Sequence, residues 1–172
     1  IKRYESVPVI TIPYEIDYDF SNDKKSTFSE VVTQILKDCN DALAAPNNAS
    51  GFSWEIQANQ FGIMSRAVPY AIMSQAVTYA ASPLFSDGTY TWQNALDITS
   101  EALYQCTANG YKLFDVYSGA NEAQNVYATY FLTSSNDLRA VDKETIYQGG
   151  VQMQVWKYAG LPSTDGVDKA GP

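Results

Sequence analysis

A run of small residues that ends at a proline constrains the fold of this chain more than any other feature. Residues 65–81 are rich in alanine and serine, and Pro83 follows within the run Tyr79-Ala80-Ala81-Ser82-Pro83-Leu84-Phe85. Small side chains let a helix approach its neighbour closely, whereas proline stops a helix. We predict a helix over 65–81 that has Ser65 as its N-cap and small residues along one side: Ala67, Ala71, Ser74, Thr78 and Ala81.

Helical periodicity predicts two further helices, one before and one after this segment. The first covers 27–45 and opens with a capping box formed by Thr27 and Glu30. The other covers 91–108, with Thr91 as its N-cap and Asn109-Gly110 as its end. We expect its buried stripe to hold Trp92, Ala95, Leu96, Thr99, Ala102, Leu103 and Cys106.

Together these segments predict a mainly α fold of tetratricopeptide-like, stacked antiparallel helices with long irregular segments. A short helix is expected around 122–132, and a strand-like stretch at about 145–158 supplies a short β element near the C-terminal end. We expect residues 1–172 to form a single domain that is part of a larger protein extending on both sides.

Composition excludes several classes of function. The chain has no histidine, which removes the usual general base and the commonest metal ligand. No two carboxylates are fixed together as glycoside hydrolysis requires, so we expect no enzymatic activity. Acidic residues outnumber basic ones by 19 to 11 and no basic cluster exceeds two residues, which argues against nucleic acid as a partner.

Two acid- and thiol-containing patterns are interpreted as structural. Cys39 and Cys106 lack the spacing of a metal site, and we expect free buried thiols, with a disulfide as the open alternative. Residues 17–23 place oxygen-bearing side chains at alternate positions, as a calcium loop does, but the closing glutamate is missing. A solvated acidic turn is the simpler interpretation, so we expect no metal and no cofactor.

The candidate binding site lies on the predicted strand. Residues 151–158 alternate in polarity, which directs one set of amides and aromatic rings to a common face. Amides exchange hydrogen bonds with sugar hydroxyls, and aromatic rings offer flat apolar faces. The expected glycan-binding residues are therefore Gln152, Gln154, Trp156 and Tyr158. The alternative is that further chain covers this face.

Several short motifs occur in an order that resembles the SusD/RagB family of outer-membrane lipoproteins. They are Val7-Pro8-Val9-Ile10, Tyr79-Ala80-Ala81-Ser82-Pro83-Leu84-Phe85, Trp92-x-x-Ala95, Gly110-Tyr111-x-Leu113 and Lys143-Glu144-x-Ile146-Tyr147. The resemblance implies a surface-exposed lipoprotein of the cell outer membrane that binds glycans without catalysis. It also implies that the glycan is handed to a TonB-dependent transporter of the SusC type, and that the only membrane contact is an N-terminal lipid anchor outside this chain. A helical-repeat adaptor that binds protein and no carbohydrate is the alternative.

Overall fold

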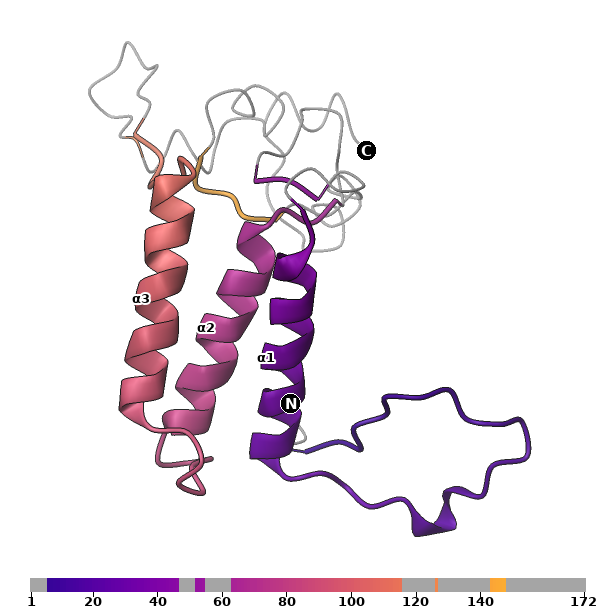
Figure 1. Cartoon of the computed structure of the whole chain (residues 1–172). Coiled ribbons are helices and arrows are strands. Elements are labelled where there is room, and N and C mark those ends of the chain that lie inside the picture. The colour runs from indigo at the N-terminus through magenta and orange to yellow at the C-terminus, as the bar shows by residue number, and fades with distance from the viewer. Residues whose placement is uncertain (1–5, 47–51, 55–62, 116–125, 127–142, 148–172) are drawn as a thin grey trace, which may run out of the picture. The chain divides into compact units, whose positions relative to one another are not determined.

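The computed structural model describes residues 6–46, 52–54, 63–115, 126 and 143–147 (Figure 1). These residues form three α-helices and a 3-10 helix, η1 (Phe20–Asn22), and they contain no β-strand. The mainly helical prediction is thus confirmed for this part of the chain. Of the predicted strand-like stretch at about 145–158, the structure describes only residues 145–147, which are not in a strand, and the rest lies outside the described residues, as does nearly all of the predicted helix at 122–132.

The chain divides into two compact units. One comprises residues 1–46 and 69–105, and the other comprises residues 47–68 and 106–172. The expectation of a single domain within a larger protein stays a prediction. None of the helices among the described residues is long and apolar enough to cross a membrane.

Helix α1 (Phe28–Ala44) begins where the sequence predicts. The Thr27 hydroxyl accepts a hydrogen bond from the Glu30 N–H at 3.2 Å, and the Glu30 carboxylate accepts one from the Thr27 N–H at 2.7 Å. This reciprocal pair satisfies two backbone donors at the helix start. The helix ends before Pro46, because the residue that precedes a proline disfavours helical backbone.

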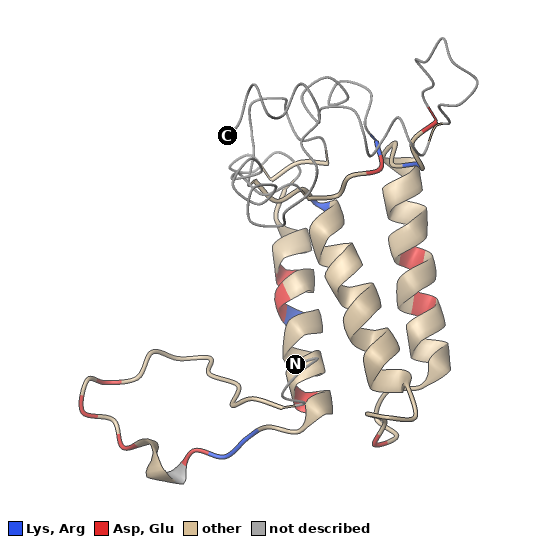
Figure 2. Cartoon of the chain, turned by 180° about the vertical axis from the view of Figure 1, so that it is seen from behind, with Lys and Arg blue, Asp and Glu red and all other residues tan. Residues whose placement is uncertain are grey.

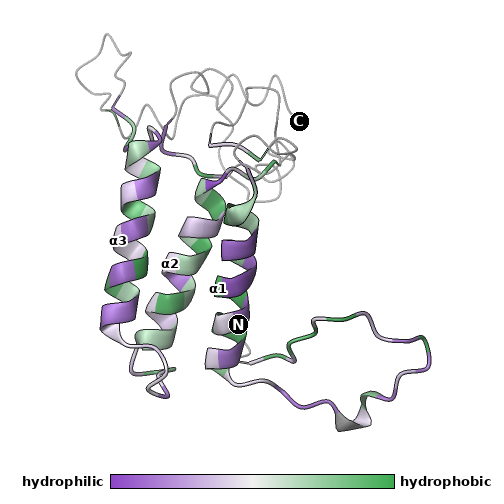
Figure 3. Ribbon diagram, in the orientation of Figure 1, coloured by the Kyte–Doolittle hydropathy of each residue, from purple (hydrophilic) through white to green (hydrophobic). Residues whose placement is uncertain are grey.

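Helix α2 (Ala67–Ala81) carries no charged residue and is the most uniformly apolar of the three helices (Figures 2 and 3). Pro69 lies in its first turn, where a backbone N–H has no partner within the helix. The helix begins two residues after Ser65. The Ser65 hydroxyl donates to the Ile146 carbonyl oxygen at 3.2 Å. Ser65 is therefore not the side-chain N-cap that the sequence predicts.

Helix α2 lies between α1 and α3 (Trp92–Ala108), and successive helices run in opposite directions (Figure 1). On one side Val32 of α1 packs with Ala76 and Ala80. On the other side two α2 residues pack with an α3 residue, in a cluster formed by Val77, Ala81 and Ala95. Alanine side chains at these positions keep the contact surfaces small, which allows the helices to approach each other closely.

The loop before α3 reinforces these contacts. Phe85, from the proline-containing run, stacks on Phe28 of α1 with ring centroids 4.6 Å apart. Tyr90 packs against both the α1–α2 cluster and the α2–α3 cluster. The aromatic residues Phe85 and Tyr90 of the loop between α2 and α3 therefore pack against the helices.

The predicted contact faces need correction. On α2 the predicted residues Ala67 and Ala81 are buried, whereas Thr78 is exposed. The rest of the buried face consists of residues outside the predicted set: Val68, Met73, Ala76, Val77 and Ala80. On α3 only Ala95 and Ala102 are buried, while Trp92, Leu96 and Leu103 are 58%, 57% and 70% exposed. The reason is that α3 contacts α2 through Ala95, with Ile98 packed against the same cluster, so Trp92, Leu96 and Leu103 remain exposed.

In the second unit, α3 ends in the predicted left-handed cap. Gly110 has φ +89°, its N–H donates to the Thr107 carbonyl oxygen at 3.0 Å, and the Tyr111 N–H donates to the Cys106 carbonyl oxygen at 2.9 Å. This is a Schellman motif. It positions the Tyr111 hydroxyl 2.8 Å from the Trp54 carbonyl oxygen and 3.0 Å from Ser65 Oγ.

We predict that Ala80→Leu lowers the free energy of unfolding by about 1–3 kcal/mol, because the added atoms overfill the contact with Val32. Thr78→Leu is the matched control, since it adds a leucine to the exposed side of the same helix and should change stability by no more than about 0.5 kcal/mol. Urea unfolding followed by circular dichroism measures both. Equal losses would contradict the assigned face of α2.

Candidate functional site

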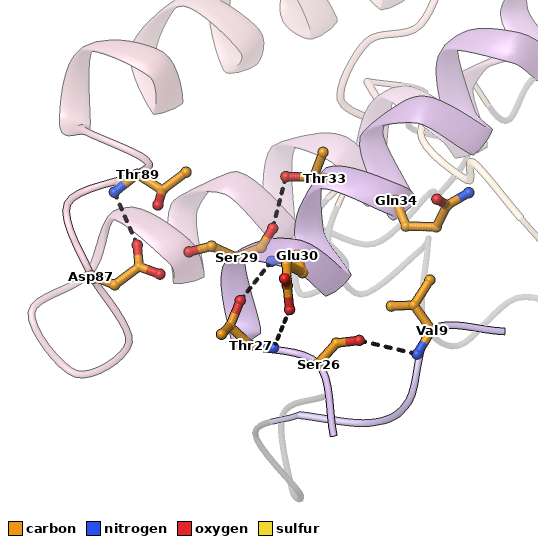
Figure 4. A pocket seen from close by; sticks show the side chains of 9 residues that line it. All are labelled: Val9, Ser26, Thr27, Ser29, Glu30, Thr33, Gln34, Asp87 and Thr89. Atoms are coloured by element: carbon orange, nitrogen blue, oxygen red, sulfur yellow. Dashed lines mark hydrogen bonds between the residues drawn. The ribbon is translucent and has the colours of Figure 1, made fainter. Parts of the chain in front are cut away.

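A polar pocket of about 430 Å³ lies at the N-terminal end of α1 (Figure 4). Three segments supply its walls: the extended chain before η1, the start of α1, and the loop between α2 and α3. Hydroxyl groups dominate, accompanied by two carboxylates, one amide and one aliphatic side chain. The lining residues are Val9, Ser26, Thr27, Ser29, Glu30, Thr33, Gln34, Asp87 and Thr89.

Local hydrogen bonds hold the first wall in place. The Ser26 hydroxyl accepts from the Val9 N–H at 3.2 Å, and the Ser26 N–H donates to the Val7 carbonyl oxygen at 3.3 Å. These bonds attach the extended segment to the residue that precedes the Thr27–Glu30 capping box. The same sequence signal that starts α1 therefore also shapes the pocket.

The second wall is the turn at Asp87. Asp87 Oδ1 accepts a hydrogen bond from the Thr89 N–H at 2.9 Å, and the intervening Gly88 has φ +86°, which glycine adopts without strain. The Thr89 backbone N–H, followed by the hydroxyls of Thr89 and Ser29, lowers the pKa of Asp87 below its usual value. Asp87 therefore presents a carboxylate, not a carboxylic acid, to the pocket at neutral pH.

Ser29 distinguishes this pocket from an ordinary surface hollow. The residue is only 4% exposed, and its Oγ is buried without a hydrogen-bond partner among the described residues. Figure 4 shows this hydroxyl directed toward the Asp87 turn, and the hydroxyl helps to lower the Asp87 pKa. Buried hydroxyls are nearly always paired. Because this one is unpaired, it can bond to a ligand without losing an existing hydrogen bond.

The far end of the pocket connects to the helix contacts. Thr33 Oγ1 donates to the Ser29 carbonyl oxygen at 2.8 Å and lies 2.7 Å from the Tyr90 hydroxyl. The Gln34 side-chain nitrogen donates to Asp38 at 2.7 Å, which leaves the Gln34 amide oxygen able to accept. Such a set of groups can bind hydroxyls by hydrogen bonding.

A separate aromatic cluster lies in and just before the acidic segment 17–23, whose spacing of oxygen-bearing residues is like that of a calcium loop. The Tyr14 and Tyr18 rings stack with centroids 4.0 Å apart, and their hydroxyls donate to the two oxygens of Asp23 at 2.8 and 2.6 Å. Asp19 accepts a hydrogen bond from the Ser21 N–H at 2.9 Å. Within the described part of the chain, no group of three or more acidic or cysteine residues could hold a metal ion.

None of the described residues that line this pocket was predicted as a site residue from the sequence. The predicted site residues Gln152, Gln154, Trp156 and Tyr158 lie outside the described residues. Sequence reasoning missed Ser29 and Asp87, because they are far apart in the chain and share no motif. The one available signal was a serine on the apolar stripe of the first helix.

Both cysteines are free, as predicted. Cys39 is buried and Cys106 is partly buried. Burial raises the pKa of both thiols, and the nearby Asp38 carboxylate adds to the effect at Cys39. Neither thiol has the lowered pKa of a reactive cysteine.

We predict that Tyr18 ionises with a pKa of about 12, because its hydroxyl hydrogen bond to Asp23 is lost on ionisation. Since the folded pKa exceeds the usual value of about 10, the stabilisation is complete below pH 10 and is lost as the pH rises through about 12. Near-ultraviolet absorbance of tyrosinate measures this. Asp23→Asn should lower the pKa of Tyr18. Asp17→Asn is the control: it removes an equal charge nearby and should leave the pKa of Tyr18 unchanged.

We predict that Ser29→Ala raises the free energy of unfolding by about 1 kcal/mol, because it removes a buried hydroxyl that has no partner. Ser74→Ala is the matched control, because it removes a hydroxyl that does have a partner: the Ser74 hydroxyl donates to the Tyr70 carbonyl oxygen at 2.8 Å. Thermal unfolding of both variants without ligand measures the difference. A loss of stability in Ser29→Ala would show that the hydroxyl is already paired.

Comparison of the chain with protein-family models, curated proteins and solved structures found no match.

Proposed function

We propose that this chain binds glycans without chemical conversion and that the pocket at the start of α1 is a saccharide-binding site. The observation that carries the proposal is the buried, unpartnered hydroxyl of Ser29 within a pocket lined by hydroxyls and carboxylates. A group of this kind costs stability in the empty protein. A ligand that pairs with it recovers that cost as binding energy.

The chemistry of the lining suits a polyol. A sugar hydroxyl donates one hydrogen bond and accepts others, and so does the Ser29 hydroxyl. Glu30 and Asp87 each have one carboxylate oxygen that accepts from a backbone N–H and a second that can accept from a ligand. The volume of about 430 Å³ falls within the range of about 300–1,000 Å³ that is typical of small-ligand sites.

The wider role follows from the sequence resemblance alone. We propose a SusD-like lipoprotein of the outer membrane, built on a tetratricopeptide-like scaffold, that delivers its glycan to a TonB-dependent transporter of the SusC type. Gln152, Gln154, Trp156 and Tyr158 would then add a second contact surface for a longer glycan. The absence of histidine supports a binding function without catalysis.

A protein-interaction adaptor is the second candidate, and one observation favours it. Trp92, Leu96 and Leu103 are spaced to lie on one face of α3 and are all more than half exposed. Exposed apolar side chains of this size on one helix face are typical of protein contact surfaces. An adaptor of this kind would use α3 and would leave the pocket without a ligand.

A glycan array followed by calorimetric titration separates the two candidates. We expect the chain to retain a defined set of oligosaccharides, and we expect Ser29→Ala to weaken binding about ten-fold, which corresponds to about 1.4 kcal/mol. Ser74→Ala and Trp92→Ala should bind as the unmodified protein does. Retention of no saccharide at all would contradict the proposal and leave the adaptor function.

A further inference from the structure

We infer that the pocket at the start of α1 accepts neutral or amine-bearing sugars and rejects acidic sugars. This inference deepens the proposed glycan-binding function and rests on it. Its basis is the charge of the lining together with the hydrogen-bonding groups that remain unoccupied.

The charge of the lining is negative. Of the residues that the structure describes, Glu30 and Asp87 both contribute to the walls, and no lysine or arginine does. Lys24 and Lys25, the nearest basic residues before α1 in sequence, are exposed and do not line the pocket. A carboxylate or sulfate group on a sugar would therefore meet the negative charges of Glu30 and Asp87, and like charges repel each other when they lie close together.

The start of α1 does not supply the missing positive charge. A helix N-terminus attracts anions through its backbone N–H groups. Here the capping box already places the Glu30 carboxylate beside that end, with its oxygen on the Thr27 N–H, and the Thr27 hydroxyl accepts from the Glu30 N–H. The protein has thus provided its own anion at the position that a ligand anion would otherwise occupy.

The pocket also offers several hydrogen-bond acceptors to a ligand that donates. The Thr33 hydroxyl hydrogen and one of the two hydrogens on the Gln34 side-chain nitrogen are already used by partners within the protein, whereas the Ser29 hydroxyl has no partner among the described residues. Acceptors remain at the second oxygens of Glu30 and Asp87 and at the Gln34 amide oxygen. Sugar hydroxyls and protonated sugar amines supply donors, whereas uronate and sulfate groups supply only acceptors.

An array of oligosaccharides in matched neutral, 2-amino and uronic acid forms tests this inference. The probes are gluco-, galacto- and manno-oligosaccharides of equal length and linkage. Titration of retained pairs at low salt should give an affinity for the uronic form at least about ten-fold weaker than for the neutral form. Asp87→Asn should reduce the ratio of the neutral-form affinity to the uronic-form affinity about ten-fold, because the change removes the charge and keeps the shape of the side chain. Asp97→Asn, an equal charge change on the exposed face of α3, should leave that ratio unchanged.

The possible outcomes separate the two proposals. Uronic and neutral forms that bind equally, with both weakened by Ser29→Ala, would overturn the charge selectivity and leave glycan binding intact. Glycan binding that is insensitive to Ser29→Ala and Asp87→Asn would place the site elsewhere and overturn the inference. Retention of no oligosaccharide in any form would overturn the proposed function itself, and the selectivity with it.

Discussion

The close contact of α2 with the helices on both sides is the constraint on which the first compact unit depends. α2 carries no charged residue and meets α1 through Ala76 and Ala80 and α3 through Val77 and Ala81. Small side chains permit this approach, and a larger side chain at these positions would overfill the contact. The two outer helices can then carry polar and charged residues on their free faces, because α2 supplies the apolar surface that both need (Figure 2).

The pocket is a by-product of how α1 starts. The Thr27–Glu30 capping box fixes the first turn, and the second helical position brings Ser29 against the loop that connects α2 to α3. An apolar or partnered residue there would be more stable. The chain instead keeps a hydroxyl that lacks a partner among the described residues, and a cost of this kind is often tolerated where function requires it.

The sequence was informative where structure is locally determined. The starts of α1 and α3 and the glycine cap after α3 follow from residues within a few positions of each boundary, so Thr27, Thr91 and Gly110 identified them. The buried faces were less predictable. Trp92, Leu96 and Leu103 form a regular apolar stripe, but periodicity does not say how many neighbours a helix has. The pocket could not be predicted, because only the packing of α1 against α2 brings Asp87 near Ser29.

Tyr90 gives the arrangement one more consequence. Its ring packs on both helix–helix clusters, and its hydroxyl lies 2.7 Å from Thr33, whose own hydroxyl bonds to the Ser29 carbonyl oxygen. The walls of the pocket are thereby held in their final positions when the helices assemble. The entropy of ordering them is lost during folding and not at the moment of encounter, so a ligand meets a preorganised surface and keeps more of its interaction energy as affinity.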